Sequence, residues 1–165
     1  MLDLVTAARV LDCDEGHCQL AWRNIYICNT IARATSENIS SLAAHFDAFA
    51  ARTFERPIAF LLLTQASTSP PAASDRKRFT DVLAKHGSRI GGVGIGLAAE
   101  GFAGAVLRSV ASAVFLLPRT RYEVRFFSKS SDAATWVARI GGCSASEVTQ
   151  LIQLSNQEIA TRRAT

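Results

Sequence analysis

The residues most suggestive of chemistry are a group of glycines near the middle of the chain. Gly94-Ile-Gly96-Leu-Ala-Ala99 matches the GxGxxG/A pattern of loops that cradle the pyrophosphate of a dinucleotide. Such a loop follows a strand and opens a helix, whereas these glycines lie inside the apolar run Ile90–Leu97. In place of the acidic residue expected about twenty residues later, the sequence has Arg119 and Arg121. We therefore interpret the glycines as positions at which another element packs closely on a strand.

The histidines and cysteines do not form a recognised catalytic or metal-binding set. The histidines are His17, His45 and His86, and neither an HExxH motif nor a nucleophile elbow accompanies them. The candidate zinc ligands are Cys13, His17, Cys18 and Cys28, without the two tight ligand pairs that structural zinc sites normally show. We expect no catalytic residue, no metal site, no cofactor and four reduced cysteines. A small enzyme, with a site that folding assembles from distant residues, stays open as an alternative.

The most informative polar segment is the loop from Thr64 to Asp75. It leaves an apolar strand and enters a helix, which is where open α/β sheets place their binding sites. A bound or covalent phosphate would be favoured there by the helix dipole and by the basic run Arg76-Lys77-Arg78. The alternative is a solvated loop that ends in a helix cap. The candidate binding residues are Ser67, Thr68, Ser69, Ser74, Arg76 and Arg78.

The elements that would position this loop alternate between helix and strand. Extended segments at 7–13 and 18–28 flank a turn at 14–17, where Gly16 favours a hairpin, and the join at Arg23 and Asn24 is either a bulge or a second tight turn. Apolar runs predict strands at 58–63 and 90–97, and 123–127 is the last predicted strand. Helical spacing predicts helices from Thr35 or Ser36 onward, from Ser74 or Asp75 to Gly87, over 102–117, and from Ser130 or Ser131 to Gly142. This order predicts an α/β fold with a mixed, mainly parallel sheet, an N-terminal antiparallel hairpin and four helices.

One further helical segment follows this alternation. Ser144 and Glu147 have the spacing of a capping box, and basic residues at 162 and 163 suit a helix C-terminus. We divide the chain into an α/β domain at 1–142 and a C-terminal helical extension at 143–165. The extension can pack on its own domain or on a second copy, and its place beyond a complete domain favours the second. The candidate interface residues are Val148, Leu151, Ile152 and Ile159.

The composition is that of one globular domain. Of the 165 residues, 48% are hydrophobic and 19% are charged. No apolar run reaches the roughly 18–20 residues that span a bilayer, and the start of the chain lacks the basic region of a secretion signal, so we expect a cytoplasmic protein. The net charge is +4, and arginine supplies fifteen of the eighteen basic residues, which suits contacts with carboxylates, phosphates or another protein. Since these residues are neither concentrated nor interleaved with aromatic ones, we expect no nucleic-acid partner.

Three stretches of the chain resemble the STAS fold of anti-sigma-factor antagonists. The central strand, loop and second helix of that fold are matched by Phe60-Leu-Leu-Leu-Thr64, Pro70-Pro71 and Asp75-Arg-Lys-Arg78. Its alanine-rich third helix, last strand and terminal helix are matched by 102–117, Phe126-Phe127 and Asp132-Ala-Ala-Thr-Trp-Val137. The similarity is to the divergent STAS-like proteins of deltaproteobacteria, and it covers residues 18–142.

The resemblance implies a regulatory domain that binds proteins, and not an enzyme. Phosphorylatable antagonists carry a switch serine or threonine at the start of the second helix, in an Asp-Ser-Ser/Thr-Gly-like setting. This chain lacks that motif and has a longer loop with two prolines, so no single residue of it is assigned as the phosphorylatable switch. We expect a regulatory or scaffolding domain that binds a protein partner and itself, as a homo-oligomer. The alternative is a domain that binds a small ligand or lipid, since some relatives hold apolar ligands; it requires an enclosed apolar cavity above the strand ends.

Overall fold

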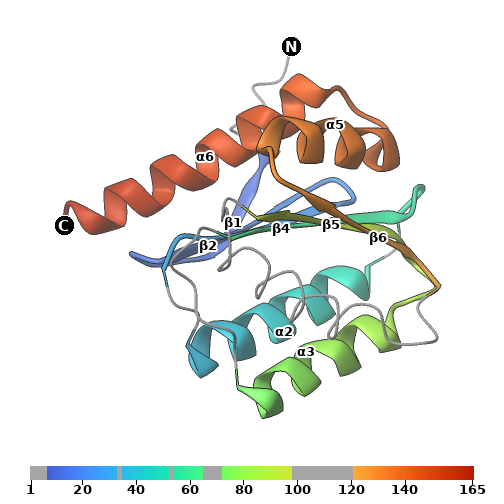
Figure 1. The fold of residues 1–165 in the computed structure, drawn as a ribbon, viewed down its shortest axis with the longest axis horizontal. Coiled ribbons are helices and arrows are strands. Elements are labelled where there is room, and N and C mark those ends of the chain that lie inside the picture. Colours follow the sequence, from blue (N-terminus) through green and yellow to red (C-terminus); the bar gives the residue numbers. More distant parts are fainter. Residues whose placement is uncertain (1–6, 33–34, 53, 65–71, 98–120) are drawn as a thin grey trace.

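A six-stranded sheet with helices on both faces forms the framework of the protein (Figure 1). The structure is a computed structural model that describes residues 7–32, 35–52, 54–64, 72–97 and 121–165. Its strands are β1 (Arg9–Cys13), β2 (His17–Trp22), β3 (Ile25–Thr30), β4 (Ile58–Thr64), β5 (Ile90–Leu97) and β6 (Glu123–Phe127). Its helices are α2 (Ser36–Ala50), α3 (Ala73–Lys85), α5 (Ser130–Gly141) and α6 (Ala145–Arg163). The helix expected over 102–117 lies outside the described residues.

The strands lie in chain order across the sheet, and their directions match the predicted mixed topology. β1, β2 and β3 pair antiparallel, while β3, β4, β5 and β6 pair parallel. The extended segment at 18–28 is two strands, and of the two possibilities for its join at Arg23 and Asn24 the structure has the tight turn. Arg23 takes a positive φ of 50°, and the Asn24 side chain donates to the Pro57 carbonyl at 2.7 Å. The α/β class, the mixed sheet and the antiparallel N-terminal hairpin are thereby confirmed.

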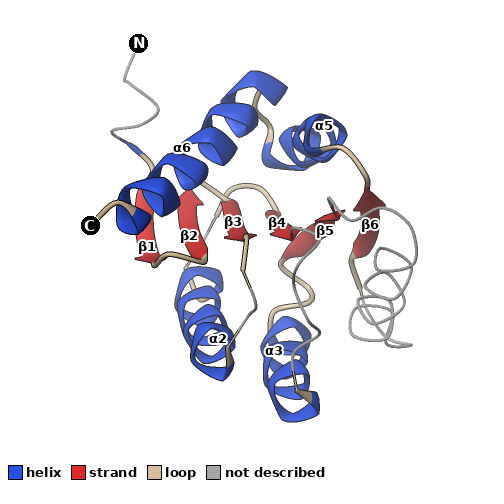
Figure 2. Cartoon of the chain, turned by 60° about the vertical axis from the view of Figure 1, so that its left-hand side comes forward, coloured by secondary structure: helices blue, strands red, loops and turns tan. Residues whose placement is uncertain are grey.

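Two apolar cores fill the space between the sheet and its helices. α2 and α3 cover one face, and α5 and α6 cover the other (Figure 2). β4 contributes to both cores, since Phe60 packs on the α2–α3 side and Leu61 on the α5–α6 side. The core under α2 and α3 is rich in aromatic side chains, and the ring centroids of Tyr26 and Phe46 lie 5.2 Å apart in an edge-to-face arrangement. Burial on both faces explains why β4 and β5 have continuous apolar runs.

The glycines of β5 lie inside the strand, as expected, and their role is close packing. A Cβ atom on Gly92 would lie 2.5 Å from a ring carbon of Trp136 and 2.6 Å from the Ile140 side chain. The element that approaches the strand is therefore α5. These residues form a strand interior and not the turn that would cradle a pyrophosphate.

The predicted N-terminal caps are present at two helices and are wrong at the two others. Thr35 and Ser144 cap α2 and α6 through capping boxes, and the box of Ser144 and Glu147 is the predicted one. The predicted serine and aspartate caps of α3 and α5 are wrong, because both helices begin one or more residues earlier. Their N-cap residues are Ala72 and Lys129, and neither makes a side-chain capping bond. Within the described residues, no helix combines the length and apolar character needed to cross a membrane.

Candidate functional site

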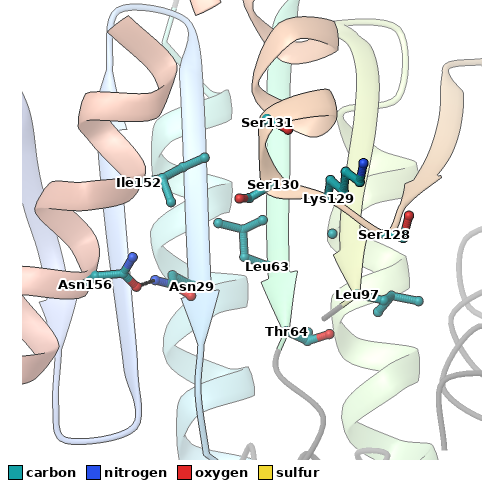
Figure 3. Close-up of a pocket in the computed structure, with 11 residues that line it drawn as sticks. Asn29, Leu63, Thr64, Leu97, Ser128, Lys129, Ser130, Ser131, Ile152 and Asn156 are labelled. Carbon is teal, nitrogen blue, oxygen red and sulfur yellow. Dashed lines mark hydrogen bonds between the residues drawn. The ribbon is translucent and has the colours of Figure 1, made fainter. Parts of the chain in front are cut away.

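A pocket of about 400 Å³ lies at the carboxyl edge of the parallel strands (Figure 3). Its floor comes from the last residues of β3, β4 and β5, and its walls from the start of α5 and the middle of α6. Carboxyl edges of parallel sheets are where α/β proteins place ligands, because strand ends and helix N-termini converge there. The lining residues are Asn29, Leu63, Thr64, Gly96, Leu97, Ser128, Lys129, Ser130, Ser131, Ile152 and Asn156.

Hydrogen bonds fix the polar wall of this pocket. Asn29, at the end of β3, is buried, and its amide nitrogen donates to Ser155 at 2.9 Å and to Asn156 at 2.7 Å. Both acceptors belong to α6, so the helix and the central strand are tied together at the pocket. The Thr64 hydroxyl at the end of β4 is buried and has no hydrogen-bond partner within the described part of the chain. This wall presents fixed amide and hydroxyl groups to whatever occupies the pocket.

The opposite wall is the N-terminus of α5. Ser128, Lys129, Ser130 and Ser131 are all exposed there. Because Lys129 leaves the first N–H groups of α5 without a side-chain cap, these groups and the lysine charge favour an anionic or strongly polar group nearby. Sequence reasoning assigned the serines to a helix cap and missed the pocket. The polar run directly after β6 was the signal that could have found it.

The predicted phosphate loop is only partly within the described residues. Ser67, Thr68 and Ser69 lie outside them, whereas Ser74, Arg76 and Arg78 lie in the first two turns of α3. Ser74 is exposed, and the guanidinium group of Arg78 donates to the hydroxyl of Ser40 in α2. Asp75 is buried and accepts a hydrogen bond of 2.6 Å from Ser36 at the start of α2. We call the exposed side chains of Ser74, Lys77 and Arg78 the α2–α3 surface.

The predicted interface stripe on α6 packs against its own sheet. Val148, Leu151, Ile152 and Ile159 are 0%, 1%, 8% and 1% exposed, and they join the core under α5 and α6. The helix was expected to pack either on its own domain or on a second copy, and in the structure this stripe packs on its own domain. A contact between two copies through α6 would therefore use the outer face of the helix, where Gln153 and Gln157 are exposed.

A polar network joins the β1–β2 hairpin to α2. His17 was expected in a turn but opens β2 and is buried; its Nε2 lies 3.1 Å from Asp12 and its Nδ1 2.8 Å from Asp14. Ser41 donates to the same Asp12 carboxylate and lies 3.2 Å from Nδ1 of His45. The Asp12 carboxylate is thus hydrogen-bonded to Ser41 and not to His45. In a Ser-His-Asp triad the carboxylate contacts the histidine, which contacts the serine, so these three residues are not arranged as a triad. His86 lies elsewhere, paired with Asp47 at 2.6 Å.

The carboxylates of this network have shifted acidities. Burial raises the pKa of Asp12, but hydrogen bonds from Ser41 and His17 outweigh it and hold the pKa below its ordinary value. Burial also raises the pKa of Asp14, and it is outweighed by hydrogen bonds from the Gly16 backbone and from His17. A lowered folded-state pKa means that ionised Asp12 stabilises the fold above its unfolded pKa near 3.8, and that this stability is lost as the pH falls through the folded value.

Asp12→Asn is expected to lower the free energy of unfolding at neutral pH by about 1–2 kcal/mol, because the charge-assisted hydrogen bonds weaken. The deficit should shrink at about pH 3, where the wild-type carboxylate also begins to take up its proton. Urea denaturation at the two pH values measures both effects. Glu55→Gln, on an exposed carboxylate, is the control and should change little at either pH. A deficit of equal size at both pH values would contradict this account.

The cysteines of the proposed zinc set do not converge on one point. Cys18 belongs to the core under α5 and α6, whereas Cys28 belongs to the core under α2 and α3. His17 turns toward α2, where Asn38 approaches it at 3.0 Å. Among the described residues, no group of three or more histidine, cysteine, aspartate or glutamate side chains is placed to hold a metal ion.

The sheet order, the antiparallel hairpin and the helices on both faces define an α/β domain with the SpoIIAA-like, or STAS-like, fold. Among solved structures, the chain is similar to an uncharacterised protein of the DUF3478 family from Shewanella loihica PV-4, which has that fold. The TM-score is 0.50 at 18% sequence identity, over 68% of this chain and 83% of that one. No protein-family model matches the sequence, and a search of curated proteins finds no match. The narrower resemblance to deltaproteobacterial proteins stays a prediction.

Proposed function

We propose that this chain is a non-enzymatic regulatory domain that acts by binding another protein through its α2–α3 surface. The observation that carries the proposal is the pair of contacts that ties the starts of the two helices together. Ser36 donates to Asp75 at 2.6 Å, and Arg78 donates to Ser40. Between them these contacts hold the two helix N-termini side by side at the carboxyl edge of the sheet. The STAS-like fold agrees with a regulatory role.

The chemistry of this surface suits a protein partner with acidic groups. Ser74, Lys77 and Arg78 are exposed there, and Arg78 keeps further guanidinium N–H groups beyond the one that contacts Ser40. Lys77 is partly neutralised by Asp81 at 2.7 Å, an exposed pair that contributes little to folding. Since Asp75 fixes the helix ends before binding, little ordering is needed when the partner docks.

Arg78→Glu is the matching test of the proposed contact. Reversing this charge is expected to weaken partner binding at least about tenfold, which is the size of effect that a charge pair at an interface can carry. Quantitative affinity capture from a lysate of the source cells measures it, with wild type and variant compared at equal loading. Arg139→Glu, on the exposed side of α5, is the matched control and should retain the partner. If Arg139→Glu lost the partner while Arg78→Glu retained it, the contact would lie on the α5–α6 face and not on the α2–α3 surface.

A second function is favoured by the pocket. We propose that it binds a small molecule with a polar or anionic group, with Asn29 and the start of α5 on the polar side and Leu63, Leu97 and Ile152 on the apolar side. A volume of about 400 Å³ is within the range of small-molecule sites. The lining is mixed, so it does not match the enclosed apolar cavity that the small-ligand or lipid alternative was expected to need.

Ser131→Trp is expected to abolish small-molecule binding without disturbing the core, because Ser131 is exposed at the pocket wall. Native mass spectrometry of the purified protein, with wild type and variant side by side, shows whether a bound mass disappears. Thr135→Trp, exposed one turn later on α5, is the control. A wild-type protein that carries no additional mass, with the variant unchanged, would contradict the ligand proposal but leave the protein-binding one intact. Self-association stays a prediction, and sedimentation over a range of concentrations tests it.

A further inference from the structure

Two of the four cysteines face each other across the first hairpin. Cys13 is the last residue of β1, and Cys18 is the second residue of β2. They are Cα partners in the antiparallel register, so their side chains leave the sheet on the same face. That face is the one covered by α6, where Cys18 lies in the core and Cys13 packs against it. Neither proposed function uses them.

The hydrogen bonding of the hairpin brings the two thiols within reach of a covalent bond. Asp14 donates its backbone N–H to the His17 carbonyl at 2.9 Å, which makes the adjacent pair of Cys13 and Cys18 the non-hydrogen-bonded kind. Such pairs have Cα atoms about 4.5 Å apart, inside the range of about 4.4–6.8 Å that disulfides span. The strands need little movement to accept an S–S bond.

We propose that Cys13 and Cys18 form a redox-active dithiol that low-molecular-weight disulfides oxidise to a cross-strand disulfide. Both cysteines are free thiols in the structure. Cys13 is half-buried and Cys18 is fully buried, so Cys13 is the sulfur that an external disulfide can reach. Cys28 is buried on the other face of the sheet, under α2 and α3, so it cannot substitute for either partner.

The reaction proceeds as two exchange steps. The Cys13 thiol loses its proton, and its sulfur attacks one sulfur of a disulfide RSSR; the S–S bond breaks, RS⁻ leaves, and a mixed disulfide forms. The Cys18 thiol then gives up its proton, and its sulfur attacks Sγ of Cys13 and displaces the second RS⁻. The protein loses two electrons and two protons, and RSSR gains them to become two RSH molecules.

The surroundings of Cys13 set the rate of the first step. Burial raises the pKa of the Cys13 thiol, and the hydrogen bond from Cys18 opposes this effect. Glu158 and Asp14 raise the pKa further, while Arg162 of α6 lowers it. Burial raises the pKa of Cys18 more strongly. Cys13 is therefore the attacking sulfur and Cys18 the resolving one, and oxidation should speed up as the pH rises above neutral.

Oxidised glutathione is a suitable probe, with the full folded chain and peptide mapping after trypsin. Cys13 and Cys18 share the tryptic peptide 10–23, which contains neither Cys28 nor Cys143. The wild-type peptide is expected to lose the mass of two hydrogen atoms, to resist alkylation and to recover both thiols on reduction. Cys18→Ala should instead stop at a glutathione adduct on Cys13, and Cys143→Ala should behave as wild type.

Two results on the wild-type protein would overturn the proposal. One is a peptide 10–23 that keeps two free thiols under conditions in which the urea-unfolded chain forms the disulfide. The other is a stable glutathione adduct on Cys13 that Cys18 never displaces. Both are read on the wild-type chain, so the test holds even where a cysteine variant fails to fold.

Discussion

Leu151→Ala is expected to lower the free energy of unfolding by about 2–5 kcal/mol. Leu151 is 1% exposed and lies in the core that α5 and α6 form with the sheet. Removing its side chain leaves a cavity between α6 and the strands, and the rigid sheet on the other side cannot collapse to fill it. The prediction treats α6 as part of the domain, although the sequence places it beyond a complete α/β alternation.

Denaturant unfolding, followed by the fluorescence of the two tryptophans, measures this effect. Gln153→Ala, on the exposed face of the same helix, is the control, because it changes helix composition without touching the core. A Leu151→Ala protein within about 0.5 kcal/mol of wild type, the range of surface substitutions, would show that 143–165 is an extension that contributes little to the fold. A large loss of unfolding free energy would show that residues 143–165 belong to the folded domain and that 142 is not a domain boundary.

Gly92→Ala is expected to cost about 2–3 kcal/mol, although alanine normally stabilises a strand relative to glycine. The added Cβ would lie 2.5 Å from the Trp136 ring and 2.6 Å from Ile140, so either α5 moves away from β5 or the ring leaves its position. Trp136 is buried and packs on Phe127 with ring centroids 5.7 Å apart, which leaves the ring little room to turn.

Gly94→Ala is the matched comparison in the same strand. The nearest atom to its added Cβ is a methyl carbon of Val137 at 3.3 Å, which can yield by a few tenths of an ångström. Thermal unfolding of both variants should show a clear loss for Gly92→Ala and a change within about 1 kcal/mol for Gly94→Ala. Equal losses would mean that strand composition, and not the approach of α5, determines the effect.

The parallel strands β4 and β5 were predictable because they are buried on both faces. β5 occupies the predicted range 90–97, where the apolar run is continuous, and β6 occupies the predicted range 123–127 although Glu123 and Arg125 interrupt its apolar residues. The break between β2 and β3 could be placed at Arg23 and Asn24 but not assigned to a bulge or a tight turn, because the join contains no glycine and has apolar residues on both sides. Arg23 takes the positive φ that glycine would usually supply.

The candidate site was less predictable, for two physical reasons. The pocket joins Asn29 to Asn156 across most of the chain, and no local pattern indicates which strand end meets which helix. Asp75 was identified as a helix cap, yet it makes a tertiary contact with Ser36, because a carboxylate near a helix start can accept from another helix as well as from its own backbone. The apolar stripe of α6 was recognised, but a stripe fits any apolar surface and does not name its partner.

Site-specific photo-crosslinking tests the proposed α2–α3 surface most directly. A photoreactive amino acid at position 77 lies on that surface, and one at position 153 lies on the outer face of α6, across the sheet; both positions are exposed. After irradiation in the source cells, position 77 is predicted to give a discrete adduct of higher mass that Arg78→Glu removes, while any adduct from position 153 is unchanged by Arg78→Glu. A discrete adduct from position 153 together with none from position 77 would contradict the assignment of this surface.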